Sequence, residues 1–234
     1  MSRLNELATG LAGVDERIRR ACAASGRDPS EITVVVVTKT FPASDVRLLA
    51  ELGVRDIGES RDQEAAPKAA QCADLDLRWH FVGQLQTNKA ASVARYATVV
   101  HSVDRPRLVD ALDRGAVSAG RLLRCLVQVS LDESSAAGAH RAGTSPAEAV
   151  ALADRVAAAT SLLLAGVMAV APLGGDPDAA FATLADVAAE VRTRHHTANW
   201  VSAGMTEDLE SAVAHGATHL RVGSAILGTR PPAG

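Results

Sequence analysis

Aromatic side chains are scarce in this 234-residue sequence: they account for 3% of it, whereas apolar residues as a whole account for 47%. A core with so few rings has to be built from valine, leucine, isoleucine and alanine, which suits helices packed on parallel strands. Cysteines are few as well, and the three that occur, Cys22, Cys72 and Cys125, lie far apart without a CxxC pair. This spacing argues against a disulfide framework and against a zinc site, and it predicts buried, reduced thiols.

The sequence also lacks a strong charge excess, a secretion signal and a long apolar run. Its 24 basic and 27 acidic residues give a net charge of −3, without a basic stripe. Nucleic acid is therefore not expected as a partner. Residues 1–24 are amphipathic and charged rather than signal-like, and no apolar run is long enough to span a membrane. We expect a cytoplasmic protein with no membrane partner.

Helical patterns and short β-branched runs alternate along the chain. Helices are predicted at residues 4–25, 43–52, from 61 onward, 88–96, 105–119, 145–160, 177–195 and 206–217, and strands at 33–38, 54–58, 78–83, 98–103, 122–131, 162–170, 199–205 and 218–226. Eight strands that alternate with helices are typical of an α/β fold of the closed (β/α)₈ or TIM-barrel type, so we expect one barrel domain over residues 1–234. An open doubly wound sheet is the alternative, but no GxGxxG follows the first strand.

The segment ITVVVVTKTFP brings a lysine, Lys39, to the end of the most apolar strand. Four consecutive valines predict a strand buried on both faces, and functional residues of barrels gather at the C-terminal ends of strands. Side chains alternate along a strand, so Lys39 shares a face with Val35 and Val37 and is expected at the barrel mouth. Desolvation there favours the neutral amine, which can attack a carbonyl to form a Schiff base. The alternative is a lysine that reaches solvent.

Two loops near the end of the sequence have the composition of a phosphate site. Their candidate residues are Ser202, Gly204 and Thr206 in VSAGMTEDL, and Arg221, Gly223 and Ser224 in RVGSAILG. Backbone N–H groups at glycine-containing helix starts bind anions, and barrels commonly hold phosphate in the loops after strands seven and eight. An ordinary N-cap at Thr206 and a surface arginine at Arg221 are the alternatives. A lysine for an aldehyde together with a phosphate pocket predicts pyridoxal 5′-phosphate (PLP) as the cofactor.

These segments resemble the pyridoxal phosphate homeostasis proteins, whose fold is similar to the barrel domain of alanine racemase without its second domain. The resemblance covers about residues 33–230 and rests on VTKTFP, IGESRDQE, WHFVGQLQTNK, HSVD, GVMAV and SAGMTEDLESAVAHGATHLRVGSAILGTR. It implies a fold-type III PLP barrel in which Lys39 forms the Schiff base. With it, the expected cofactor-binding residues are Lys39, Glu59, Ser60, Met168, Ser202, Gly204, Met205, Arg221, Gly223 and Ser224, with no catalytic residue and no metal.

Two positions depart from the pattern of this family. Ser60 stands where the family usually has asparagine, and the loop ESSAAGAHRAG has Ser135 in place of a lysine that many members carry, with Arg141 as an electrostatic substitute. The resemblance also implies that Arg221 donates to the pyridine nitrogen of PLP. Such a donor keeps the nitrogen unprotonated and weakens PLP as an electron sink, which suits a carrier better than a carbanion enzyme. We expect His80, in the middle of a strand, to be structural.

Three functions remain open from the sequence. We favour a PLP homeostasis protein without strong catalytic activity, monomeric, that binds PLP and other B6 vitamers and contacts apo-enzymes transiently. A PLP enzyme such as an amino-acid racemase or decarboxylase is disfavoured, because no second domain is expected to supply an opposing base and the only tyrosine, Tyr96, lies between a helix and a strand. A Schiff-base aldolase for a phosphorylated sugar would use the same lysine and loops without a cofactor.

Overall fold

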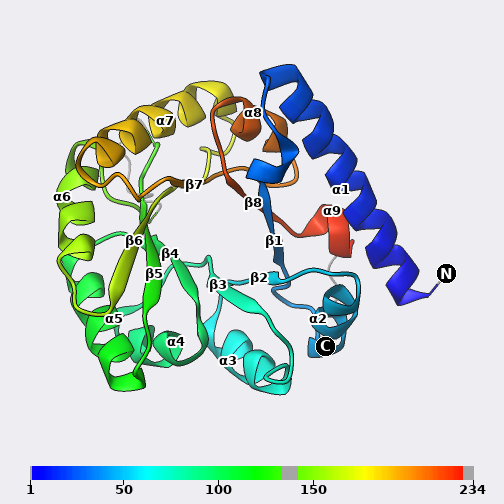
Figure 1. Ribbon diagram of the computed structural model, residues 1–234, viewed down its shortest axis with the longest axis horizontal. Coiled ribbons are helices and arrows are strands. Elements are labelled where there is room, and N and C mark those ends of the chain that lie inside the picture. The colour runs from blue at the N-terminus through cyan, green and yellow to red at the C-terminus, as the bar shows by residue number, and fades with distance from the viewer. Residues whose placement is uncertain (1, 133–141, 229–234) are drawn as a thin grey trace.

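The computed structural model describes residues 2–132 and 142–228. In these residues, eight parallel strands close into a barrel in which each strand pairs with the next and β8 pairs with β1 (Figure 1). The strands are β1 (Thr33–Val37), β2 (Asp56–Glu59), β3 (Arg78–Phe81), β4 (Val99–Val103), β5 (Leu123–Gln128), β6 (Leu162–Met168), β7 (Trp200–Ser202) and β8 (His219–Val222). The closed strand order confirms the predicted (β/α)₈ barrel and rules out an open doubly wound sheet.

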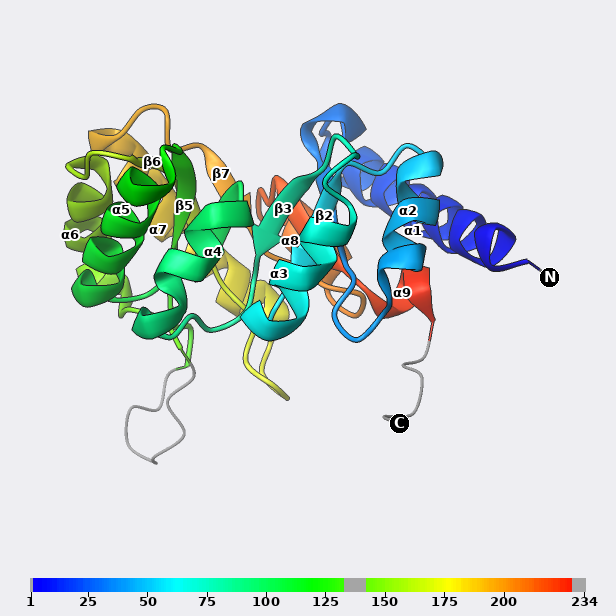
Figure 2. The same ribbon diagram turned by 90° about the horizontal axis from the view of Figure 1, so that it is seen from below.

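Helices surround the strands, as the two perpendicular views show (Figure 1, Figure 2). They are α1 (Arg3–Ser25), α2 (Ala43–Glu51), α3 (Asp62–Gln71), α4 (Ala90–Tyr96), α5 (Pro106–Ala119), α6 (Pro146–Ala157), α7 (Pro177–Arg194), α8 (Leu209–Ala214) and α9 (Ser224–Leu227), with 3₁₀ turns η1 (Pro29–Glu31) and η2 (Thr87–Lys89). Their ends follow local signals: α1 and α5 both stop at a glycine in the left-handed region, Gly26 and Gly120, which only glycine adopts freely.

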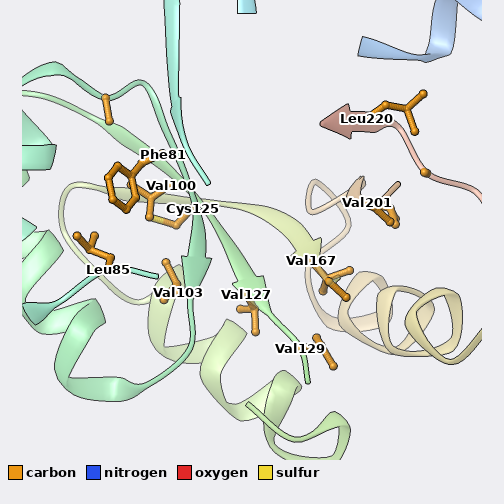
Figure 3. Packing of buried hydrophobic residues seen from close by; sticks show 14 of the residues in the cluster. Phe81, Leu85, Val100, Val103, Cys125, Val127, Val129, Val167, Val201 and Leu220 are labelled. Carbon is orange, nitrogen blue, oxygen red and sulfur yellow. The ribbon is translucent and has the colours of Figure 1, made fainter. Parts of the chain in front are cut away.

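The core has two layers because successive side chains of a strand point to opposite faces. One layer lies between the strands and the helices, and Figure 3 shows part of it, including Val100, Val127 and Val167. The other face of the strands fills the barrel interior. There a small separate apolar cluster, formed by Val99, Leu126, Ala165 and Met168, packs beside buried polar side chains.

Helix α1 packs against α8 and α9, beside the pairing of β8 with β1 (Figure 1). The helices can approach closely because Gly10 has no side chain: a Cβ atom at this position would lie 2.6 Å from the carbonyl oxygen of Ile226. The first helix of the chain therefore supports the last one. Helix α9 begins at Ser224, within the segment predicted to be strand up to residue 226, because β8 already ends at Val222.

Several element boundaries differ from prediction near the barrel mouth, among them the start of α8 and the end of β5. Helix α8 begins at Leu209 rather than at residue 206, because Asp208 occupies the N-cap position and the hydroxyl of Thr206 contacts Ser224 instead. Strand β5 ends at Gln128, so residues 129–131 are already loop, apart from one isolated bridge between Val129 and Thr144. Within residues 2–132 and 142–228, no helix has the length and apolarity of a membrane span.

Candidate functional site

A cavity of about 620 Å³ lies at the C-terminal ends of the strands. This volume falls within the range of about 300–1,000 Å³ that is usual for small-molecule sites. The loops after six strands contribute to its lining, namely those that carry Lys39, Ser60, Gly83, Pro172, Met205 and Ser224. In barrels of this type the loops at this end hold the functional residues, so the cavity is the candidate site.

Lys39 lies in a tight turn directly after β1. The turn is closed by a hydrogen bond from the Phe41 N–H to the carbonyl oxygen of Thr38, at 3.1 Å. Its third residue, Thr40, has a φ of +71°, which is strained for a β-branched residue, and its N–H donates to Glu64 at 3.1 Å. Strained backbone of this kind persists only where surrounding contacts enforce it. The lysine is therefore held at the mouth of the barrel, as side-chain alternation predicts.

The chain contains three lysines, and their surroundings differ. The amine of Lys68 is buried beside Glu59, with which it forms an ion pair, and donates to the carbonyl oxygen of Thr38 at 2.9 Å. Lys89 ends η2, outside the lining of the cavity. Of the three, Lys39 alone lines the cavity.

Arg221 is a buried cation at the inner wall of the cavity, with 5% of its surface exposed. Its Nη1 donates to Ser202 Oγ at 2.7 Å and its Nη2 donates to the carbonyl oxygen of Ala169 at 2.8 Å. Burial lowers the pKa of this guanidinium to about 10, so the side chain is still charged at neutral pH. The alternative of a surface arginine is wrong.

The loops after β7 and β8 meet at the rim of the cavity. The hydroxyl oxygens of Thr206 and Ser224 are 3.0 Å apart. Gly223 lines the cavity, and a Cβ atom there would lie 3.0 Å from the carbonyl oxygen of Val37, so the glycine allows β8 and β1 to approach each other. The N-terminal N–H groups of a helix lack intrahelical partners, and α9 begins at Ser224. Hydroxyls and N–H donors are thus gathered where a phosphate site was predicted.

The structure brings together six of the ten predicted cofactor-binding residues. Those that line the cavity are Lys39, Ser60, Met205, Arg221, Gly223 and Ser224. Ser202 lies behind Arg221 and is fully buried, and Met168 packs in the interior apolar cluster. Gly204 supports the turn after β7: its φ is +88°, and a Cβ atom would lie 2.6 Å from the Cβ of Ala212.

Glu59, one of the expected cofactor-binding residues, lies outside the cavity lining. A Cβ atom at the preceding residue, Gly58, would face Val35 and Val37 inside the barrel. Because side chains alternate along a strand, the side chain of Glu59 points the other way, toward α3. There it pairs with Lys68 and accepts a hydrogen bond from Thr38 Oγ1 at 2.6 Å. Burial raises the pKa of Glu59, against the attraction of Lys68. Ser135 and Arg141, in the loop after β5, lie outside the described residues.

Sequence reasoning missed the polar side chains that lie beneath Arg221 in the barrel interior. His101 Nδ1 is 2.9 Å from Ser202 Oγ, and Asp56 is 2.9 Å from the ring of His80. His80 is buried and hydrogen-bonded, which agrees with the structural role expected for it. The signal available in the sequence was the occurrence of polar residues at interior positions of otherwise apolar strands.

The fold and the cavity define a barrel of the alanine racemase type. Residues 11–231 match the family model described as alanine racemase, N-terminal domain. An alanine racemase of Clostridium difficile has the same fold, with a TM-score of 0.74, although it is 14% identical; the match covers 98% of this chain and 60% of that one.

Two relatives of similar length are much closer in sequence. The pyridoxal phosphate homeostasis protein of Mycobacterium tuberculosis is 43% identical over 97% of this chain and 94% of its own length. The structure of PipY from Synechococcus elongatus, solved with PLP bound, is 34% identical, covers 91% of this chain and all of that chain (100%), and has a TM-score of 0.78. The chain therefore belongs to the alanine racemase N-terminal domain family and, within it, to the pyridoxal phosphate homeostasis proteins.

Proposed function

We propose that this chain binds PLP covalently at Lys39 and holds the cofactor in reserve for other proteins. When bound, PLP supplies an aldehyde, with which a lysine amine forms a Schiff base. The observation that carries the proposal is that one lysine of the three in the chain lines the cavity. The names of the relatives, and the PLP bound to PipY, support the same cofactor and the same role.

The donors around the cavity suit the two other polar parts of PLP. Arg221 offers N–H groups to an aromatic ring nitrogen, and because arginine donates without accepting, it favours a ring nitrogen that carries no proton. Thr206, Gly223 and Ser224 provide hydroxyl and backbone donors for the phosphate. Ser60 would replace the asparagine of other family members with a hydroxyl in the loop after β2.

The same arginine supports a homeostasis role over strong catalysis. A pyridine nitrogen without a proton withdraws fewer electrons from the reacting centre, which weakens PLP as an electron sink. Reactions of amino acids that pass through a carbanion draw on that sink and are disfavoured when it is weakened. We therefore propose that the bound cofactor is protected and released rather than used in turnover, and that assays for amino-acid racemisation and decarboxylation will give no activity above background.

We further propose that the protein works as a cytoplasmic monomer that passes PLP to apo-enzymes through transient contacts. The described residues contain three buried free thiols, Cys22, Cys72 and Cys125, which suit a reducing compartment. Other B6 vitamers with a 5′-phosphate would share the phosphate and ring contacts. Those without an aldehyde would bind without a covalent link and exchange more readily.

Absorbance spectra of the purified protein with PLP, before and after borohydride reduction, test the proposal when the reduced adduct is mapped to a peptide. We expect a visible band that collapses on reduction and an adduct on Lys39. Lys39→Ala should lose the adduct with an unchanged circular dichroism spectrum, whereas Lys89→Ala should retain it. An adduct on Lys89, or an undiminished adduct in Lys39→Ala, would refute the assignment. No PLP binding in any variant would leave the phospho-sugar aldolase to be tested.

A further inference from the structure

A continuous chain of hydrogen bonds crosses the interior of the barrel, from β2 to β8. Asp56 Oδ1 is 2.9 Å from His80 Nε2, and His80 Nδ1 is 2.9 Å from His101 Nε2. His101 Nδ1 is 2.9 Å from Ser202 Oγ, which accepts from Arg221 Nη1 at 2.7 Å. All five side chains are at least nine-tenths buried. Because β4 and β7 are separated by two strands in the closed order, the bond from His101 to Ser202 spans the barrel interior.

The two ends of this chain have fixed roles. The guanidinium of Arg221 can only donate. Burial opposes ionisation of Asp56, but hydrogen bonds from Arg78 and His80 outweigh it and hold the pKa of this carboxyl well below its usual range. The Asp56 carboxylate can therefore only accept. One end is a cation beside the cavity, and the other is an anion whose second partner, Arg78, reaches solvent at the opposite end of the barrel.

The fixed ends determine which atom donates and which accepts in every hydrogen bond between them. Burial lowers the pKa of both His80 and His101, so each ring is neutral and has one N–H and one acceptor nitrogen. His80 must donate from Nε2 to the carboxylate, which leaves its Nδ1 to accept from His101 Nε2. His101 Nδ1 must then accept from the hydroxyl of Ser202. Every donor thus points from Arg221 toward Asp56.

The charge of Arg221 needs such support because its direct partners carry none. Its two side-chain hydrogen bonds in the described part of the chain go to neutral acceptors, the hydroxyl of Ser202 and the carbonyl of Ala169. The carboxylate of Asp208 acts on it only through longer-range attraction. Hydrogen bonds aligned in one direction polarise one another in a low-dielectric interior, so each makes the next acceptor more negative. The negative end at Asp56 is thereby connected to the buried cation.

We propose that this relay, formed by Asp56, His80, His101 and Ser202, fixes the guanidinium of Arg221 at the cavity and stabilises its charge there. His101 and His80 are positioning residues: they lie outside the cavity lining and act through Arg221. The relay presents the remaining N–H groups of the guanidinium to an acceptor on the ligand. The effect of the relay on a cofactor rests on the proposed function, because it assumes that PLP binds against Arg221. The donor-to-acceptor direction of the hydrogen bonds does not depend on that assumption.

The donor-to-acceptor direction of these hydrogen bonds can be measured without a cofactor. Long-range proton–nitrogen correlation spectra of the PLP-free protein, labelled with ¹⁵N-histidine, report which ring nitrogen carries the proton. We expect His80 and His101 to be neutral at pH 7 with the proton on Nε2 in both rings. A proton on Nδ1 of either ring, or a charged ring, would overturn the relay.

The effect on the cofactor can be measured with a double-mutant cycle on the PLP dissociation constant. His101→Phe removes both ring nitrogens and should weaken PLP binding about tenfold, the size of one lost hydrogen bond. In an Arg221→Gln background the same change should have no further effect, since the residue on which His101 acts is already lost. His219→Phe is the matched control: His219 is another buried barrel histidine, stacked on Trp200 with ring centroids 4.1 Å apart, and its loss should leave PLP binding unchanged.

Each result of the cycle decides between two explanations. A loss of PLP affinity that occurs only when Arg221 is present supports the relay. An equal loss of affinity with Arg221 and with Gln at that position, or no loss at all, shows that His101 does not act through Arg221. If His101→Phe does not fold, His101→Gln replaces it, because the amide NH₂ of glutamine can take the position of His101 Nε2 toward His80, whereas no acceptor remains at the position of Nδ1 toward Ser202. If the unaltered protein binds no PLP, the proposed function fails, and the imidazole spectra alone decide on the relay.

Discussion

Lys68→Met is expected to destabilise the protein strongly at neutral pH because it leaves a buried carboxylate without its cation. Glu59 is 1% exposed and Lys68 is 6% exposed, and the two form an ion pair between β2 and α3. Methionine has a similar length and no charge, so the change removes the ammonium group and little packing. The amine also donates to the carbonyl oxygen of Thr38, at 2.9 Å, which would lose this donor.

The expected magnitude follows from the burial of the pair. Removing one partner of a buried ion pair costs about 3–5 kcal/mol, because the other charge stays buried without compensation. The hydroxyl of Thr38 continues to donate to Glu59 Oε1 at 2.6 Å, which places the expected cost toward the lower end of that range. A domain has about 5–15 kcal/mol of stability in total, so the loss is a large fraction of it. The double variant Glu59→Gln/Lys68→Met removes both charges and should recover more than half of the loss.

The destabilisation should depend on pH in a definite direction. Burial raises the pKa of Glu59, and the attraction of Lys68 opposes this rise. Without Lys68, the pKa in the folded protein lies further above the unfolded value of about 4.3. A carboxyl group whose pKa is higher in the folded than in the unfolded protein stabilises the folded state at pH values below its unfolded-state pKa. This stabilisation is lost as the pH rises through the folded-state pKa. The variant should therefore be closest to the unaltered protein near pH ~4.5 and furthest from it at neutral pH.

Urea unfolding followed by circular dichroism, at acidic and neutral pH, measures these differences. Lys89→Met is the matched control, since Lys89 is partly exposed and lies at the end of η2. Its midpoint should stay close to that of the unaltered protein. A loss below about 1 kcal/mol for Lys68→Met at neutral pH, the value typical of an exposed pair, would refute the reasoning. So would a loss that increases as the pH falls.

Two further predictions concern packing and the thiols. Gly13→Ala should raise stability by about 0.5–1 kcal/mol, since a methyl group there meets nothing within 4 Å and alanine favours a helix. Gly10→Ala should lower it by about 1–3 kcal/mol, because its Cβ would lie 2.6 Å from the Ile226 carbonyl oxygen; thermal melts of the two variants must then shift in opposite directions. A thiol-specific chromogenic reagent should label the folded protein slowly and the urea-unfolded protein rapidly. The reason is that burial raises the pKa of all three thiols, Cys22, Cys72 and Cys125. Fast labelling of the folded protein would contradict their burial.

Much of the fold was predictable because its signals are local. Runs of β-branched residues and the caps of helices are read within a few residues, and their alternation predicts the barrel. Exact strand ends were less predictable: β7 has three residues where seven were expected. Backbone hydrogen bonds to β8 continue as far as Gly204, where a φ of +88° turns the chain in close contact with Ala212. That contact joins separate segments and leaves no local pattern.

The same distinction applies to the candidate site. Lys39 and the glycine-containing loops were found because strand ends and turns have recognisable sequences. Glu59 was expected to bind the cofactor because of its place in the chain, but the alternation of β2 turns it toward Lys68, nine positions later. The contact of His101 with Ser202 joins residues 101 positions apart across the barrel, and no sequence pattern predicts it. Polar residues on an interior strand face were the available hint, and only the three-dimensional register shows their partners.

The pairing of β8 with β1 has a consequence for the order of events during translation. Val35 in β1 lies opposite Arg221 in β8, so the first and last strands of the barrel supply neighbouring walls of one cavity. Synthesis proceeds from the N-terminus, and Lys39 leaves the ribosome long before Arg221 and Ser224 are made. A nascent chain therefore has its amine well before it has the pocket around it, and the cavity is completed only when the last strand has emerged and closed the barrel.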